Sequence, residues 1–171
     1  TVTGVQTCAL PISQMQMVPN QAPKLKIEIL DSIVSGSFDA VLSLGEVGDT
    51  AKSIYGVCVK IKYDPELMVP GAITVDFSNT WLDSTGNSNL ITQYYLDDVN
   101  GVLTIVEARK NHLAITGFGE LATIHFEGEV AVIQQRDLTP FHVSIMGDSK
   151  VLNNSVFYPG NSGYVQHFIN V

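Results

Sequence analysis

The sequence has little of what enzymes, membrane-spanning proteins and disulfide-bonded domains usually depend on. Its 171 residues include two cysteines, one tryptophan and nine basic residues, and only 15% are charged. No stretch approaches the roughly 18 consecutive apolar residues that a membrane helix needs. The first residues do not combine a basic region with an apolar one, as a secretory signal does, so we expect the natural N-terminus to lie upstream.

The chain is acidic, with a formal net charge of −8. An acidic surface repels phosphate groups, so we expect neither nucleic acid nor an anionic membrane among its partners. Hydrophobic residues make up 45% of the chain, which is enough for a packed core and argues against disorder. The length fits a single domain.

Catalytic and metal-binding motifs are missing from the sequence. The histidines are dispersed and form no HExxH pair on one helical face. The GxSxG elbow, the phosphate-binding P-loop and the GxGxxG turn are also missing. We therefore predict a protein that is not an enzyme and needs no cofactor. The four histidines are His112, His125, His142 and His167.

The chain divides into an extended N-terminal segment, residues 1–23, and a single β-sandwich domain, residues 24–171. Residues 2–12 resemble the translation of a sequencing adapter, which indicates a metagenomic origin and would make Cys8 foreign to the natural protein. A disulfide between Cys8 and Cys58 has no support from spacing, and a free Cys58 on a strand is the preferred interpretation.

Apolar residues recur at every second position from residue 24 onward, which is typical of strands with one buried face. This alternation predicts about nine strands. We place them at Lys24–Leu30, Phe38–Leu44, Val57–Tyr63, Ile73–Phe77, Leu90–Leu96, Val102–Glu107, Leu121–Glu127, Phe141–Ile145 and Tyr164–Ile169.

Turn-forming sequences separate these strands. Asn100-Gly101, between two alternating runs, is the strongest hairpin signal, and Asp64–Met68 is compatible with one helical turn. No other segment shows a sustained 3.6-residue periodicity. Many short strands joined by turns predict an all-β fold, an antiparallel β-sandwich of two sheets with a jelly-roll or immunoglobulin-like arrangement.

Two stretches together resemble the cohesin family. One is the turn Gly48–Thr50 followed by Tyr55–Leu67, and the other is Gly119–Phe126. The chain resembles a cohesin-like or carbohydrate-binding-module-like jelly-roll domain of bacterial surface proteins. This resemblance implies a binding function and an extracellular or cell-surface location. A cohesin docks a calcium-loaded dockerin, whose calcium loop does not occur in this sequence.

Two groups of oxygen-bearing side chains are candidates for calcium. Asp97, Asp98 and Asn100 form the first group, because calcium prefers carboxylate and amide oxygens. The alternative is a solvated hairpin rim, which we favour because the full ligand spacing is missing. The second and similar candidate comprises Asp76, Asn79 and Asp83.

Aromatic side chains give a further hypothesis, a sugar-binding platform, and packing in the core is the alternative role for them. Trp81 and Tyr94 could stack against a pyranose ring. Tyr95 follows Tyr94 directly, so the two tyrosines point to opposite faces of a strand. We therefore expect at least one of the tyrosines to pack into the core.

Four positions fit glycosylation patterns. Ser32, Thr50 and Ser84 each follow an aspartate and precede a small or aliphatic residue or threonine, as in O-glycosylated bacterial surface proteins. Asn153 begins an N-glycosylation sequon. Ordinary turn and capping chemistry explains the same residues equally well.

The predicted function is a structural or adhesive extracellular module that contacts other copies of itself or other surface proteins. The sequences at both ends are of extended type, and an open sheet edge can accept a neighbour's strand. Assembly into filaments by strand exchange is therefore a further hypothesis. Two alternatives stay open: a carbohydrate-binding module for polysaccharide, and a cohesin-type docking domain.

Overall fold

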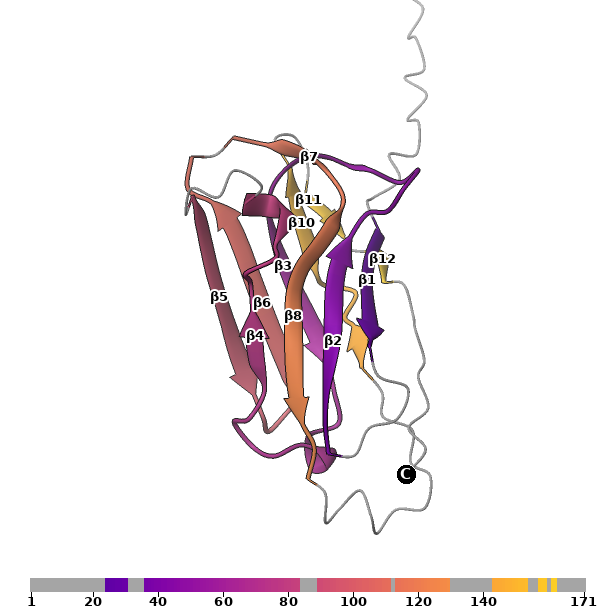
Figure 1. Cartoon of the computed structure of the whole chain (residues 1–171), viewed down its shortest axis with the longest axis vertical. Coiled ribbons are helices and arrows are strands. Elements are labelled where there is room, and N and C mark those ends of the chain that lie inside the picture. The colour runs from indigo at the N-terminus through magenta and orange to yellow at the C-terminus, as the bar shows by residue number, and fades with distance from the viewer. Residues whose placement is uncertain are drawn as a thin grey trace, which may run out of the picture.

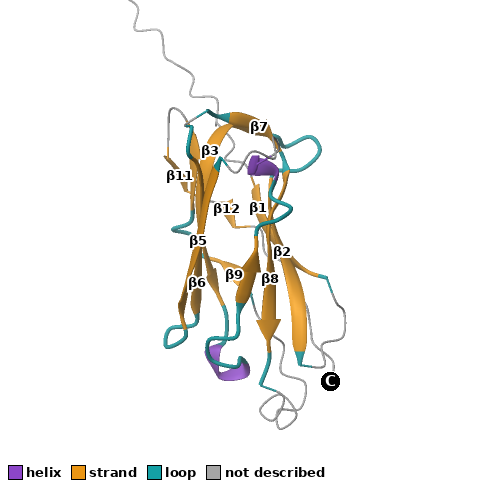
Figure 2. Ribbon diagram, turned by 60° about the vertical axis from the view of Figure 1, so that its left-hand side comes forward, coloured by secondary structure: helices purple, strands orange, loops and turns teal. Residues whose placement is uncertain are grey.

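The chain folds as two β-sheets packed face to face (Figures 1 and 2). The computed structural model describes residues 24–30, 36–83, 89–111, 113–129, 143–153, 157–159 and 161–162. Within them the secondary structure is almost entirely strand, which confirms the all-β sandwich. The helical elements of the described part are two 3-10 turns, η1 (Pro65–Leu67) and η2 (Trp81–Asp83).

The first sheet has five strands in the order β12-β1-β2-β8-β4. Its pairs are antiparallel except for β1 and β12, which run parallel. The strands are β1 (Lys24–Ile29), β2 (Ser37–Leu44), β4 (Thr74–Asp76), β8 (Gly119–Glu127) and β12 (Asn161–Ser162).

The second sheet has seven strands, with β11-β10-β3-β6-β5 as its main path and β7 and β9 also paired to β3. All of its pairs are antiparallel. The strands are β3 (Ala51–Lys62), β5 (Leu90–Asp97), β6 (Val102–Arg109), β7 (Ile115–Gly117), β9 (Ser144–Ile145), β10 (Lys150–Asn153) and β11 (Phe157–Pro159).

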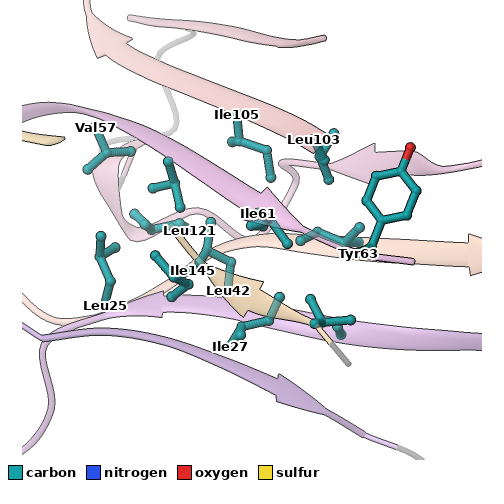
Figure 3. Packing of buried hydrophobic residues seen from close by; sticks show 14 of the residues in the cluster. Leu25, Ile27, Leu42, Val57, Ile61, Tyr63, Leu103, Ile105, Leu121 and Ile145 are labelled. Atoms are coloured by element: carbon teal, nitrogen blue, oxygen red, sulfur yellow. The ribbon is translucent and has the colours of Figure 1, made fainter. Parts of the chain in front are cut away.

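The core lies between the sheets, where the alternation read from the sequence brings apolar side chains together (Figure 3). Every second residue of β2 is buried. The neighbouring strand β1 adds Leu25 and Ile27 to the core, and β6 of the opposite sheet adds Leu103 and Ile105. Phe38 and Phe126 stack with ring centroids 5.0 Å apart. Burying a side chain of this size stabilises the fold by about 2 kcal/mol.

The predicted hairpin at Asn100-Gly101 is confirmed and joins β5 to β6. Gly101 has φ 58, a left-handed conformation that glycine adopts without steric cost. A Cβ atom there would also collide with the carbonyl oxygen of Tyr63. The turn therefore packs directly against the end of β3.

The predicted helical turn after β3 is confirmed as η1. Asp64 precedes it, and its carboxylate accepts a hydrogen bond from the backbone N–H of Glu66 at 3.0 Å. Pro65 occupies the first position of the turn, where its missing N–H costs nothing. The Asp-Pro sequence thus turns the chain from one sheet toward the other.

Several predicted strands differ in extent from those observed. β3 begins at Ala51 instead of Val57, because its first residues pair with β7 across a bulge near Ser53, whose φ is 56. Only Ser144–Ile145 of the predicted Phe141–Ile145 strand is seen in the described part. The predicted strand Tyr164–Ile169 lies outside the described residues.

Candidate docking surface

The outer face of the seven-stranded sheet is a broad surface whose side chains point away from the core. Inward-facing and outward-facing residues alternate along β6, and the ladder carries this alternation without a register shift from β5 through β6 to β3. We call this surface the docking face. It comprises Ile91, Gln93, Tyr95 and Asp97 of β5, Val102, Thr104, Val106 and Ala108 of β6, Gly56, Cys58, Lys60 and Lys62 of β3, and Lys150 and Leu152 of β10.

The middle of the docking face is apolar. Val106 pairs with Cys58 on one side and with Gln93 on the other, and all three face outward. Cys58 is a free thiol and half-buried. Toward β5 the apolar character increases, since Ile91 is 52% exposed and Tyr95 is 68% exposed. Exposed apolar groups of this kind, gathered on one surface, are typical of interaction sites.

Gly56 allows β3 and β6 to approach closely under this face. A Cβ atom at Gly56 would lie 2.7 Å from the carbonyl oxygen of Glu107. Gly56 is itself buried, and the Leu152 side chain of β10 would lie 3.3 Å from the same Cβ atom. The missing side chain thus permits the close packing of β3 against β6 and β10 at this point.

Lysines border the apolar area on β3 and β10. Lys60 forms an ion pair with Asp148, which holds the pKa of the lysine above its usual value and the pKa of the carboxyl below its usual range. Lys62 donates a hydrogen bond to the carbonyl oxygen of Asn100. The border of the docking face therefore carries charges of both signs, since Asp148 pairs with Lys60 and Asp97 lies opposite Val102, which in turn pairs with Lys62.

The calcium candidates of the β5–β6 turn are engaged by protein donors. The Asp97 carboxylate accepts hydrogen bonds from the backbone N–H of Asn100 at 3.0 Å and from its side-chain amide at 2.8 Å. These bonds lower the pKa of Asp97. Asp98 accepts from the Tyr63 hydroxyl at 3.0 Å and from the Gly71 N–H at 3.1 Å. These carboxylates thus fasten the turn to neighbouring segments.

The second calcium candidate is spread over more than one element. Asp76 ends β4 and accepts hydrogen bonds from the backbone and hydroxyl of Ser78, whereas Asp83 lies in η2. In the part of the chain that the structure describes, no three His, Cys, Asp or Glu side chains gather in a way that could hold a metal ion. Neither calcium candidate therefore shows an assembled ligand shell.

Trp81 and Tyr94, the candidates for sugar stacking, occupy different surroundings. Trp81 packs on β7 and β8, where a Cβ atom at Gly117 would lie 3.0 Å from its ring. Tyr94 lies at the margin of the seven-stranded sheet and is 40% exposed. The expectation that Tyr94 or Tyr95 packs into the core is wrong, because β5 extends past the short opposite strand β4 and leaves both rings exposed.

A buried polar cluster that the sequence did not reveal lies between β6 and η2. The inward positions of β6 begin with Leu103 and Ile105 but continue with Glu107 and Arg109, both buried. The Thr80 hydroxyl donates to the Glu107 carboxylate at 2.7 Å. Burial raises the pKa of Glu107 to about 7, although the hydrogen bond from Thr80 acts in the opposite direction.

The same cluster ties η2 to the sheet by a second bond. The Arg109 guanidinium donates to the backbone carbonyl of Leu82. Further polar atoms in this region are buried without a protein partner among the described residues, namely Trp81 Nε1, Asp83 Oδ1, Glu107 Oε1 and Arg109 Nε. The sequence placed Glu107 at the end of a predicted strand, and only the tertiary structure shows that Thr80 and Leu82 supply partners to these buried charged residues.

Two of the four predicted glycosylation positions fall in the described part. Thr50 lies between the Gly48-Asp49 turn and β3 and is partly exposed. Asn153 is the last residue of β10. Ser32 and Ser84 lie outside the described residues.

Cohesin modules are among the solved structures that share this architecture. A cohesin module from a family 33 glycoside hydrolase of Clostridium perfringens superposes with a TM-score of 0.60 at 16% sequence identity, covering 87% of this chain and 97% of that one. The second type II cohesin module of a cellulosomal adaptor scaffoldin from Acetivibrio cellulolyticus gives 0.60 at 16% identity, with coverage of 89% and 98%. The chain has a cohesin-like fold.

A third cohesin-like neighbour was solved with its partner bound. The sixth cohesin of scaffoldin B from Acetivibrio cellulolyticus, in complex with a Cel5 dockerin mutant, superposes with a TM-score of 0.59 at 14% identity and covers 88% of this chain and 99% of that one. No protein-family model and no curated protein matches the sequence. Among the described residues, no helix is long and apolar enough to cross a membrane.

Proposed function

We propose that this cohesin-like chain is a non-catalytic docking module that binds a partner protein module through the docking face. The observation that carries the proposal is the continuous outward surface of β5, β6 and β3, apolar at its centre and bordered by lysines. A broad sheet surface of this kind suits contact with a folded partner better than it suits a small ligand.

The chemistry of the docking face indicates the character of the partner. Val106 and Tyr95 would bury apolar side chains of the partner, whereas Lys62, and Lys60 in exchange for Asp148, favour carboxylates at the border of the contact. Opposite charges at the borders of two binding surfaces mainly increase the association rate and the specificity for the right partner. They raise the affinity less. We therefore propose a partner surface that is apolar with an acidic rim.

Isothermal titration against a panel of purified dockerin modules tests this function. We expect the unaltered chain to bind at least one dockerin of the panel. Val106→Asp places a charge at the centre of the docking face and should abolish that binding. Val41→Asp is the matched control, because Val41 is also a half-buried valine on an inner strand but faces outward from the other sheet. Equal loss in both variants, or no binding to any dockerin, would overturn the proposal.

We further propose that the module works outside the cell or at its surface and that its ends allow copies to join. The observation in favour is that the edge of β1 takes an added strand, because β12 pairs with it in parallel at Lys24 and Leu25; the same edge can accept a strand from another copy. Removing residues 1–23 should then convert long assemblies to single units in electron micrographs. Single units in both forms would count against assembly through the ends.

A further inference from the structure

β5 is an open edge of the seven-stranded sheet. On one side all eight residues of Leu90–Asp97 pair with β6 in an uninterrupted register. On the other side no strand pairs with β5 among the described residues. Figure 1 shows β5 at the margin of the molecule, with β6 as its neighbour on the inner side. The backbone groups along this edge are therefore available to another strand.

This edge lacks the features by which proteins usually prevent strand pairing. β5 contains no lysine, no proline and no bulge, and its one charge, Asp97, stands at the very end. The corresponding edge of the other sheet is different, because β4 is only three residues long and ends in Asp76. A long, regular and weakly charged edge favours association with another strand.

The side chains of β5 expose apolar surface on both faces of the sheet. Ile91 and Tyr95 point to the docking face, and Tyr94 points to the inner side beyond the reach of the opposite sheet. A strand placed next to β5 would cover these groups from both faces. Apolar burial would thus add to the backbone hydrogen bonds of the new pair.

We propose that β5 pairs antiparallel with β5 of a second copy of this chain, about a two-fold axis beside Gln93. Directly opposed residues of an antiparallel pair share a face, so this register sets Ile91 against Tyr95 and Thr92 against Tyr94, each twice. β-branched and aromatic residues opposite each other stabilise strand pairs. Asp97 then lies opposite Asn89, and no like charges meet.

Other pairings of the same strand are less favourable. A parallel pair in register would bring Asp97 next to Asp97 of the second copy. An antiparallel pair centred on Tyr94 would place Asp97 opposite Ile91, and one centred on Thr92 would place Ile91 opposite Gln93. The pairing centred on Gln93 is thus the one in which the residue sequence of β5 complements itself, as an isologous contact requires.

This contact does not rest on the docking function, but it shares Ile91 and Tyr95 with the docking face and has a consequence for it. A two-fold axis perpendicular to the sheet leaves both docking faces on the same side of one continuous sheet. The dimer would present two partner-binding surfaces side by side. Because each copy has a net charge of −8, repulsion between copies is screened by salt, and the dimer is expected to strengthen as salt is added.

Sedimentation velocity of the full chain over a range of concentrations tests the dimer. The unaltered chain should show a concentration-dependent shift from monomer to dimer. Tyr94→Lys, which adds a charge at the inner side of the edge, should weaken dimerisation about tenfold or more. Val41→Lys on the other sheet is the matched control and should leave it unchanged. A monomer at every concentration would overturn the proposal.

A cross-linking experiment tests the register itself. In a background with Cys8→Ala and Cys58→Ala, Gln93→Cys places two thiols across the two-fold axis, where opposed Cα atoms lie about 5 Å apart and suit a disulfide. Ile91→Cys is the control, since its counterparts would be about 13 Å apart along the strand. Oxidation should link Gln93→Cys alone. Equal linking of both variants, or linking of neither, would overturn this register.

The dimer and the docking function can fail separately. Val106→Asp should abolish partner binding and leave the sedimentation of the dimer unchanged, because Val106 lies on an inner strand. Tyr94→Lys should prevent dimerisation and leave partner binding to each monomer intact. If Tyr94→Lys abolished partner binding as well, the edge would belong to the partner site and the dimer proposal would be wrong.

Discussion

The Thr80 hydroxyl donates a hydrogen bond of 2.7 Å to the Glu107 carboxylate inside the sandwich. Glu107 is fully buried, and the bond joins the segment before η2 to β6 of the seven-stranded sheet. A buried carboxyl group with one donor costs free energy whenever it carries charge. The stability of this protein is therefore expected to respond to the protonation of Glu107.

Glu107→Gln should remove a component of the pH dependence of stability. The pKa of Glu107 is raised from 4.5 in the unfolded reference to about 7 in the fold, so the folded state binds the proton more tightly. The contribution of Glu107 to the free energy of unfolding is complete below pH 4.5, is lost as the pH rises toward 7, and is absent above pH 7. The loss is on the order of 3 kcal/mol at most.

Urea denaturation at a series of pH values between 4 and 8 measures this contribution. The difference in unfolding free energy between the unaltered chain and Glu107→Gln should change across this interval and flatten above pH 7. Glu127→Gln serves as the control, because Glu127 is exposed at the end of β8. A constant difference across the interval would show that Glu107 titrates normally.

Thr80→Val should destabilise the fold by about 1–3 kcal/mol, because the buried carboxyl group loses its donor. It should also raise the pKa of Glu107 further, since the bond from Thr80 opposes the effect of burial. The pH interval over which stability falls would then move upward. Spectroscopic titration of the carboxyl group, or the same denaturation series, detects that movement. If only the stability fell, with the interval unchanged, Thr80 would act through packing alone.

Gly56→Ala should destabilise the protein by about 1–3 kcal/mol, because the new methyl group forces β3 and β6 apart at the Glu107 carbonyl. Gly147→Ala is the matched control, since a Cβ atom there meets nothing within 4 Å. Thermal unfolding followed by circular dichroism compares the two. Similar melting temperatures for both variants would contradict the close approach of the strands.

Calcium should leave the melting temperature of this protein unchanged. Asp97 and Asp98 are already engaged by donors from Asn100, Tyr63 and Gly71, so an ion would have to displace those bonds. Melting curves in calcium and in a chelator test this. Asp98→Ala should instead lower stability by about 1–3 kcal/mol in both conditions, since it leaves the Tyr63 hydroxyl without its acceptor. A rise in melting temperature with calcium would support the loop site.

Apolar residues at every second position predicted the strand boundaries well where a strand pairs in a regular register with its neighbours. β2, β5 and β6 lie within one or two residues of their expected places, and the Asn100-Gly101 hairpin was found from its turn residues alone. Strands such as β7 and β10 were missed, because they are short and owe their conformation to pairing with β3. The pattern of apolar residues predicts which face of a strand is buried, but it does not predict which strand pairs with it.

The candidate site could be predicted only in outline. Motifs such as Gly48–Thr50 and Gly119–Phe126 pointed to a binding fold, and the comparison with solved cohesin modules supports that fold. The outward residues of β5, β6 and β3 lie far apart in the chain, and register across the ladder brings them onto one face. The amino-acid sequence alone does not predict the register in which β5, β6 and β3 pair.

The sequence by itself determined that this chain forms antiparallel sheets around an apolar core, because side-chain alternation is a local property of each strand. Only the tertiary structure decided that Tyr94 and Tyr95 are both exposed, that Glu107 is buried beside Thr80, and that β5 forms an open edge. Each of these depends on which strand lies opposite or alongside, and contacts between distant segments set that arrangement.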